Sequence, residues 1–542
     1  MEHVSSPGLF AVNFQKAWPW AAATLSGLLL AMCFAPVGWG SLAWIALTPL
    51  VAAVWFSEEP SRFRGLRLFF LGYVCGLVYF VGSLHWLWTV TIPGWLLLGS
   101  FLAIYPGVWA VFLGLVAKPR PREGDELPVW FRSRSNFLAA ALAASAWVVL
   151  EWVRGTLFSG FGWNGLGVAL VDNLPMIQFA DITGVGGVSF LLVMVNVVAV
   201  VTVVRLRMEI LRKKMRAHYD FSLTVVLVAA AFSYGARTLL TPPPASEKLT
   251  FGAVQANVPI SQKRDPAQED QILALHARLS EFVFVQKPDL LIWPEAATPQ
   301  PLFLNQKTWE AVRGVAERHD GDFLLGTVHY EERGDFNSAV LLTQRGTDAQ
   351  IYHKMHLVPF GEYVPLRKSF PVFAWIVGDI VPEDFDFGPT ASVLELSSKP
   401  FKIGPLICFE DTLAYLARQF VHGGAQVFVT VTNNAWFLRS AGSEQHRANA
   451  VFRTIENRIP MIRAANTGVT CAIDRFGRET HRLQEADGNT FFEGFLVGSV
   501  QIASTPSLTF YTRHGDVFTL LCFAVAALAT AGAIAKKLPR KP

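Results

Sequence analysis

The sequence carries little charge for its length. Of 542 residues only 16% are charged, whereas 52% are hydrophobic and the mean hydropathy is +0.35. This balance excludes an ordinary soluble globular protein. The net charge is +4, and the excess of Lys and Arg flanks the apolar runs, so it indicates orientation in a membrane and gives no case for a nucleic-acid partner. Composition therefore predicts a membrane protein.

Cysteine is also scarce. The five cysteines are Cys33, Cys75, Cys408, Cys471 and Cys522, and three of them lie inside apolar runs. No pair has the spacing of a metal site, and no disulfide framework is indicated. We predict neither a metal nor a cofactor.

Long apolar runs dominate the first ~240 residues, and most approach the ~20 residues that cross a bilayer. The proline-rich linker from Thr241 ends this region, because proline cannot continue a helix. We expect a membrane domain of seven helices over 1–240, a soluble domain over 249–515, and an eighth helix with a tail over 516–542. The expected spans are 19–35, 41–56, 68–88, 96–117, 137–153, 187–206, 222–239 and 516–535.

Basic residues alternate between successive loops. Lys and Arg follow the second, fourth, sixth and eighth spans, whereas the intervening loops carry almost none. Because basic residues near span ends prefer the cytoplasmic side, both termini are expected in the cytoplasm. The soluble domain is then expected on the outer face of the membrane.

The soluble region alternates short apolar runs with amphipathic ones, which is typical of an α/β fold. The predicted strands are 249–254, 290–293, 323–328, 339–342, 401–407 and 427–431, and the predicted helices are 268–285 and 305–319.

Three polar side chains follow apolar runs in this region: Glu295, Lys354 and Cys408. A carboxylate, an amine and a thiol are the parts required for covalent acyl transfer. Glu295 would accept the thiol proton, and Lys354 would stabilise the oxyanion together with the backbone N–H of Phe409. A Cys/His dyad stays open as a rival, since spacing alone does not exclude a histidine base. Its candidates are His353, His356, His422 and His446.

The motifs around these residues are WPEAA at Glu295, HKMHLVPFGEYVP at Lys354 and CFED at Cys408. Together they resemble the nitrilase superfamily, whose Glu-Lys-Cys triad sits on an αββα sandwich. With membrane helices on both sides, the chain is similar to the bacterial apolipoprotein N-acyltransferases over nearly its whole length. The resemblance implies a phospholipid acyl donor, a thioester on Cys408, and the α-amino group of a diacylglyceryl apolipoprotein as acceptor. It also implies a multi-pass protein of the bacterial inner membrane with a periplasmic catalytic domain.

The same resemblance assigns supporting residues. Glu362 matches a further essential glutamate, Glu410 an active-site support next to Phe409, and Trp436 an aromatic loop residue near the substrate. Membrane lipids and the two substrates are the expected partners, and a monomer is expected.

An apolar segment, FPVFAWIV over 370–377, follows Lys354 closely and is far too short to span a bilayer. It is either a core element or an arm that touches lipid. We favour the arm, which makes Phe373 and Trp375 candidate lipid contacts.

Two other functions compete with this interpretation. A membrane-tethered amidase or nitrilase could use the same triad on a small periplasmic substrate, but one anchor would then suffice. A transporter or receptor with a non-catalytic outer domain should carry ionisable residues inside its spans, and these are nearly absent.

Overall fold

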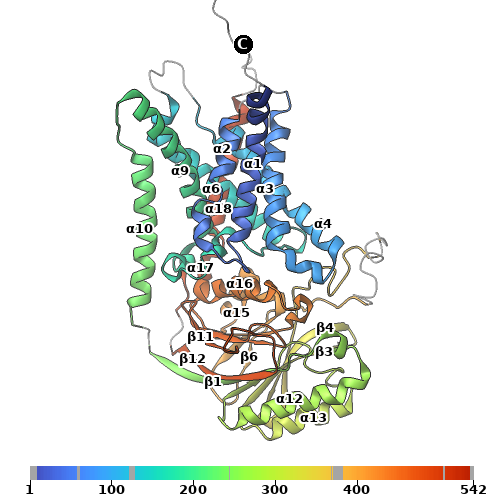
Figure 1. Cartoon of the computed structure of the whole chain (residues 1–542). Coiled ribbons are helices and arrows are strands. Elements are labelled where there is room, and N and C mark those ends of the chain that lie inside the picture. The colour runs from blue at the N-terminus through green and yellow to red at the C-terminus, as the bar shows by residue number, and fades with distance from the viewer. Residues whose placement is uncertain are drawn as a thin grey trace, which may run out of the picture. The chain divides into compact units, whose positions relative to one another are not determined.

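The computed structural model describes residues 9–57, 62–120, 128–242, 245–367, 369, 383–504 and 507–536. The chain divides into two compact units. The first comprises Met1–Thr238 with Asp516–Pro542 and is helical, whereas the second, Leu239–Gly515, contains the sheets (Figure 1).

Apolar helices make up the first unit. Six helical runs in the described part of the chain are long and apolar enough to cross a membrane, namely 64–83, 92–117, 133–159, 185–212, 219–240 and 517–535. The helices are α1 (Leu9–Met32), α2 (Thr48–Phe56), α3 (Arg64–Ser83), α4 (Ile92–Leu102), α5 (Ile104–Phe112), α6 (Ser133–Thr156), α7 (Leu174–Ile177), α8 (Ala180–Thr183), α9 (Val185–Arg212), α10 (Tyr219–Leu240) and α18 (Val517–Ala535).

These six runs correspond to six of the eight predicted spans. The second predicted span is an apolar helical run over Gly40–Phe56 that is too short to be counted with them. Its only α-helical part is α2, of 9 residues, well under the length that a bilayer core of ~30 Å requires. Helix α1 has 24 residues but is not among the six either. The arrangement with eight spans therefore stays a prediction.

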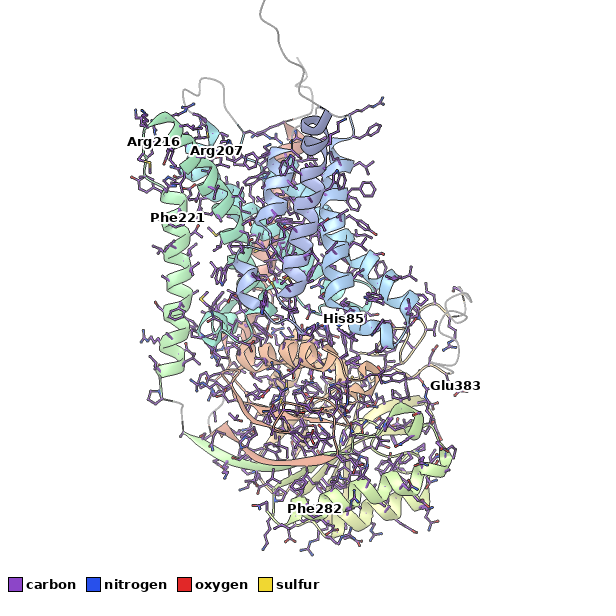
Figure 2. The ribbon with its side chains drawn as sticks, viewed as in Figure 1. His85, Arg207, Arg216, Phe221, Phe282 and Glu383 are labelled. Atoms are coloured by element: carbon purple, nitrogen blue, oxygen red, sulfur yellow. The ribbon has the colours of Figure 1, made fainter. Side chains whose placement is uncertain are left out.

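A buried ionic network joins α9 to the start of α10. Arg205 Nη1 lies 2.9 Å from Asp220 Oδ1, and both side chains are almost completely buried. His218 Nε2 lies 3.0 Å from Glu209 Oε2 in the same network. Figure 2 shows Arg207 and Arg216 at this end of α9, with Phe221 further along α10. The turn between the two helices is thus held by charges, and more basic residues surround it.

The second unit contains two six-stranded sheets. The first has the order β12-β1-β2-β3-β4-β5, in which β1, β2 and β3 are parallel. The second has the order β11-β10-β9-β8-β7-β6, in which β7, β8 and β9 are parallel. The strands are β1 (Ser246–Gln255), β2 (Leu290–Ile292), β3 (Asp322–Glu331), β4 (Gly334–Thr343), β5 (Asp348–His353), β6 (Leu394–Glu395), β7 (Lys402–Ile407), β8 (Val427–Thr432), β9 (Met461–Ala465), β10 (Cys471–Ile473), β11 (Glu479–Arg482) and β12 (Gly494–Ala503).

Helices cover the outer face of each sheet, so the unit is an αββα sandwich (Figure 1). Val254, Leu291 and Phe323 of the first sheet pack against Val283 and Val312 of the helices in a hydrophobic core. The helices are α11 (Ile260–Lys263), α12 (Glu269–Phe284), α13 (Gln306–Glu317), α15 (Ala414–His422), α16 (Gly442–Asn457) and α17 (Phe510–His514). The predicted strands and both predicted helices of this region are confirmed, with ends that differ by a few residues.

Candidate active site

Glu295, Lys354 and Cys408 each follow a strand, as predicted. Glu295 comes after β2 and Lys354 after β5, both in the first sheet, whereas Cys408 comes after β7 in the second. The ends of β2 and β7 are carboxyl ends of parallel strands, where open α/β sheets commonly place their sites. The two sheets therefore each contribute part of the candidate site.

Cys408 stands at a sharp turn from strand to helix. It is the first residue of the short helix η10 (Cys408–Thr412), and its φ is +53°. A non-glycine residue in this left-handed region costs roughly 1–2 kcal/mol, so the surrounding structure must impose the conformation. The adjacent Ile407 N–H donates to Glu410 Oε2 over 2.8 Å, which holds the turn closed. The residue that carries the thiol thus has a strained backbone conformation, which the neighbouring hydrogen bond helps to fix.

The loop that carries Glu295 has a similar constraint. Ala296 has a φ of +48°, and Ala297 N–H donates to the carbonyl of Gly326 over 2.9 Å. A Cβ atom at position 326 would lie 2.5 Å from Glu295 Cα, so only glycine lets β3 approach the loop this closely. The backbone of Glu295 is therefore packed directly on β3.

Lys354 lies between two carboxylates. Its Nζ is 2.8 Å from Glu362 Oε1 and 3.6 Å from Glu295 Oε1, and its side chain is 1% exposed. Burial alone lowers the pKa of Lys354, but the charges of Glu362 and Glu295 outweigh burial and hold the pKa well above its usual value. The ammonium group is therefore permanently charged at neutral pH.

Asn337 joins the same two carboxylates. Its Nδ2 donates to Glu295 Oε1 and to Glu362 Oε1, each over 2.8 Å. Glu362 Oε2 also accepts from the backbone N–H of Val358 over 2.8 Å. One neutral donor and one lysine thus bridge the two carboxylates. Without these partners, two negative charges this close would repel each other.

The thiol of Cys408 is protonated at rest. Its pKa is raised to about 12, chiefly by burial and then by the charge of Glu295, while Lys354 and a hydrogen bond with Thr432 act in the opposite direction. Only the thiolate is an efficient nucleophile, so this cysteine requires a base at the moment of reaction. Glu295 is the carboxylate that acts most strongly on it.

Glu410 connects the two halves of the site. Its Oε1 accepts hydrogen bonds from the hydroxyl of Tyr352 and from the backbone N–H groups of Met355 and His356, over 2.9, 2.8 and 3.1 Å. Its Oε2 accepts from Ile407. Burial raises the pKa of Glu410 to about 7, although the lysine and these donors lower it. The carboxylate therefore fixes the segment after Lys354 against the turn at Cys408.

The structure also places the other predicted residues. Phe409 is buried and its ring stacks on His356, with centroids 5.7 Å apart. Trp436 is half-buried on η11 (Asn434–Phe437), under the guanidinium of Arg264 at 5.5 Å. Phe373 and Trp375 lie outside the described residues, so the lipid contacts predicted for them stay a prediction.

The rival histidine base receives no support. His446 Nε2 lies 2.9 Å from Asp411 Oδ1 and 3.2 Å from the carbonyl oxygen of Cys408, so this nitrogen faces the backbone of the nucleophile. His422 contacts the carbonyl of Thr512 over 2.8 Å. The groups that shift the thiol pKa most are two glutamates, a lysine and a threonine, and none is a histidine.

Sequence reasoning missed three residues of this site: Asn337, Thr432 and Lys263. Lys263 Nζ donates to the carbonyl oxygens of Glu295 and Ala296, over 3.3 and 2.8 Å. Burial lowers its pKa to about 8, against the charge of Glu295. For Asn337 and Thr432 the available signal was a polar residue inside an apolar strand, whereas Lys263 resembles any surface lysine.

The comparisons with known proteins follow the two units of the fold. Residues 250–504 match the model of the carbon-nitrogen hydrolase family, and residues 26–198 match the apolipoprotein N-acyltransferase N-terminal domain. The sandwich is therefore a carbon-nitrogen hydrolase domain of the nitrilase type. Among solved structures, a carbon-nitrogen hydrolase from Helicobacter pylori G27 aligns at 15% identity with a TM-score of 0.34, over 47% of this chain and 89% of that chain.

Curated relatives cover most of the chain. An apolipoprotein N-acyltransferase from Geobacter metallireducens is 35% identical, and the alignment covers 95% of each chain. One from Allorhizobium ampelinum is 31% identical, over 88% of this chain and 89% of the relative. The chain belongs to the apolipoprotein N-acyltransferase family.

Proposed function

We propose that this protein transfers a fatty acyl chain from a membrane phospholipid to the α-amino group of the diacylglyceryl-cysteine that begins an apolipoprotein. The family assignment supports lipoprotein N-acylation in general. The observation that carries the mechanism is the Glu295–Lys354–Glu362 charge cluster beside a strained, partly exposed cysteine. Covalent acyl transfer requires such a set: a base, a fixed positive charge and a thiol.

In the first half-reaction Glu295 accepts the thiol proton of Cys408. The sulfur attacks the ester carbonyl carbon of the phospholipid, and the C–S bond forms as the C–O bond breaks. Glu295 returns the proton to the departing oxygen, so lysophospholipid leaves and a thioester remains. The charge of Lys354 and the N–H of Phe409 stabilise the oxyanion, a contribution of about 10²–10³ in rate for one such donor.

In the second half-reaction the amine of the apolipoprotein attacks the thioester carbonyl carbon. The C–N bond forms and the C–S bond breaks, and Glu295 accepts a proton from the nitrogen and passes it to the departing sulfur of Cys408. A free α-amine has a pKa of ~7.7–8.0, so part of it is neutral and nucleophilic at neutral pH. A thioester suits this step because it reacts with amines more readily than an oxygen ester does. The enzyme would thus work by a ping-pong scheme.

The positions of the basic residues favour a periplasmic catalytic domain, with eight spans and both termini in the cytoplasm. A membrane-impermeant reagent applied to intact spheroplasts should label a cysteine introduced at Asp487, but not one introduced at Lys214. Both positions are exposed in their own units. The reverse labelling pattern would exclude the proposed topology.

Intact mass analysis after incubation with phospholipid tests the covalent intermediate. The purified protein should gain one acyl-sized adduct on Cys408, which hydroxylamine removes and which the apolipoprotein discharges. Cys408→Ala should gain none. If Cys408→Ala still converts phospholipid to lysophospholipid while acylating lipoprotein, the thioester mechanism is wrong. Release of ammonia from small amides without any phospholipid adduct would instead indicate a membrane-tethered amidase.

A further inference from the structure

Three side chains with metal-ligating atoms come together at one end of the first sheet. His329 and Glu331 lie near the end of β3, and His353 is the last residue of β5. One ligand atom from each lies within 4.8 Å of the others. No cysteine takes part, so the cysteine spacing that excluded a metal motif does not apply to this cluster.

The spacing of these atoms suits a tetrahedral metal. Zinc bound to His and Glu at about 2.0–2.1 Å places its ligand atoms roughly 3.3 Å apart. His329 Nδ1 lies 3.5 Å from Glu331 Oε1, and His353 Nε2 lies 3.0 Å from that same oxygen. These separations bracket the tetrahedral value, so small side-chain rotations would bring all three atoms to one ion.

The second ring nitrogen of His353 has a hydrogen-bonding partner. Its Nδ1 lies 2.8 Å from Ser338 Oγ, and that hydroxyl can donate to the carbonyl of Phe336 over 3.3 Å. With a metal bound, Ser338 Oγ would accept from Nδ1–H, which leaves the lone pair of Nε2 for the ion. Ligating histidines typically have such a partner on their second ring nitrogen.

Pairing between the side chains explains the cluster only in part. A hydrogen bond between His353 and Glu331 accounts for the 3.0 Å distance. Nδ1 of His329, however, is buried and makes no hydrogen bond with any of the residues described in the structure. Its distance of 3.5 Å from Glu331 is long for a hydrogen bond, whereas it is normal for two ligands of one ion.

We propose that His329, Glu331 and His353 bind a divalent transition metal, with zinc as the best match. Two imidazoles and one carboxylate suit zinc, whereas calcium and magnesium prefer oxygen ligands alone. Three protein ligands leave a fourth position for water. Glu331 is 39% exposed at its side chain, which gives an ion access from solvent.

The position of the cluster gives the ion a consequence for the candidate active site. His353 directly precedes Lys354, and β4 lies between β3 and β5 in the sheet. An ion held by both outer strands would tie the end of β5 across the β3–β4 hairpin. Metal binding should therefore stabilise the segment that carries the lysine.

Cobalt and zinc titrations of the full chain test the proposal. The tag-free protein in detergent, treated with chelator and then dialysed, should bind one equivalent of Zn²⁺ by calorimetry. Co²⁺ should give the visible absorption of a four- or five-coordinate site, and Zn²⁺ should displace it. Zinc should also raise the thermal unfolding temperature.

The variants separate this site from adventitious binding. His329→Gln and Glu331→Gln should each weaken zinc binding at least 100-fold and abolish the cobalt spectrum. Ser338→Ala keeps all three ligands and should weaken binding about 10–100-fold, as losses around a ligating histidine do. His514→Gln, an exposed histidine of α17 outside the cluster, is the matched control and should bind as the parent does. Unchanged affinity and spectrum in both His329→Gln and Glu331→Gln would overturn the proposal.

Discussion

Asn337 and Glu295 are joined by a hydrogen bond of 2.8 Å, from Nδ2 of the asparagine to Oε1 of the glutamate. That same oxygen lies 3.6 Å from the ammonium of Lys354. One oxygen of the proposed base therefore accepts a hydrogen bond from the asparagine and lies near the charge of Lys354, and the asparagine orients it without adding charge.

Asn337→Asp should reduce turnover by at least 10²-fold. The substitution replaces a donor with a third carboxylate beside two others, so Glu295 loses its orienting hydrogen bond and the cluster gains repulsion. Asn489→Asp is the matched control and should leave turnover unchanged, because Asn489 is a half-buried residue of the same unit whose amide donates to Glu485 and not to the candidate site. Acyl transfer to a lipopeptide measures both. An Asn337→Asp enzyme with parental turnover would show that the asparagine does not orient the base.

The two charged neighbours of Cys408 should move its reactivity in opposite directions. Lys354 lowers the thiol pKa, so Lys354→Met should shift the pH profile of iodoacetamide alkylation to higher pH. Glu295 raises it, so Glu295→Gln should shift the profile to lower pH while also abolishing turnover. The rate of mass gain between pH 7 and pH 11 measures both shifts. Shifts in the same direction would contradict the electrostatics proposed for this site.

The strain at Cys408 predicts a difference between two inactive variants. Glycine adopts a φ of +53° freely, whereas alanine retains the steric cost. Cys408→Gly should therefore be more stable than Cys408→Ala by roughly 1 kcal/mol, even though glycine usually lowers stability relative to alanine. Chemical denaturation of the two proteins in the same detergent gives the comparison. A more stable alanine variant would indicate that the turn is unstrained.

Lys263 should influence the pH dependence of turnover. Its pKa is lowered to about 8, so it loses its charge as the pH rises through 8. Its hydrogen bonds to the carbonyls of Glu295 and Ala296 then weaken. Lys263→Met should lower kcat about 10-fold at pH 7 with little change in KM, because the lysine contacts the backbone of the base. Lys263→Arg should restore turnover and extend it to higher pH, since arginine stays charged. A methionine variant with the parental kcat and pH profile would assign Lys263 a purely structural role.

Glu410 should make the protein less stable as the pH rises from about 4.5 to about 7. Its pKa in the folded chain is raised to about 7 from an ordinary value of 4.5, so the folded state binds more protons in this window. That contribution to stability is complete below pH 4.5 and is lost as the pH passes through 7, a difference of roughly 3 kcal/mol. Glu410→Gln should flatten this part of the profile, and thermal unfolding at a series of pH values measures it. A parental slope in Glu410→Gln would place the titrating group elsewhere.

Six of the twelve strands described in the second unit were predicted, because apolar runs mark them, whereas β5, β9, β10 and β12 were not. Short strands such as β6 and β11 were not predicted, since they have 2 and 4 residues and little apolar character. Composition also does not reveal that the α-helix in the short apolar run over Gly40–Phe56 begins only at Thr48.

The residues of the candidate site also differ in how well the sequence predicts them. Motifs identified the positions of Glu295, Lys354 and Cys408, because each follows a recognisable strand. The bridging role of Asn337 depends on the pairing of β4 with β5, which places its carbonyl on the N–H of Lys354 over 2.8 Å. Contacts between strands that are distant in the sequence have no local signal, and neither does the contact of Lys263 with a loop some thirty residues away.

Glu410 accepts hydrogen bonds from Ile407 on one side and from Tyr352, Met355 and His356 on the other. Ile407 ends β7 of the second sheet, whereas the other three donors lie at or just after the end of β5 in the first, so a sliding motion of one sheet over the other would have to break several hydrogen bonds to Glu410 together. Glu410 thus helps to set the spacing between the nucleophile and the lysine. Movements of the outer loops of the domain can then leave the relative positions of Cys408 and Lys354 unchanged.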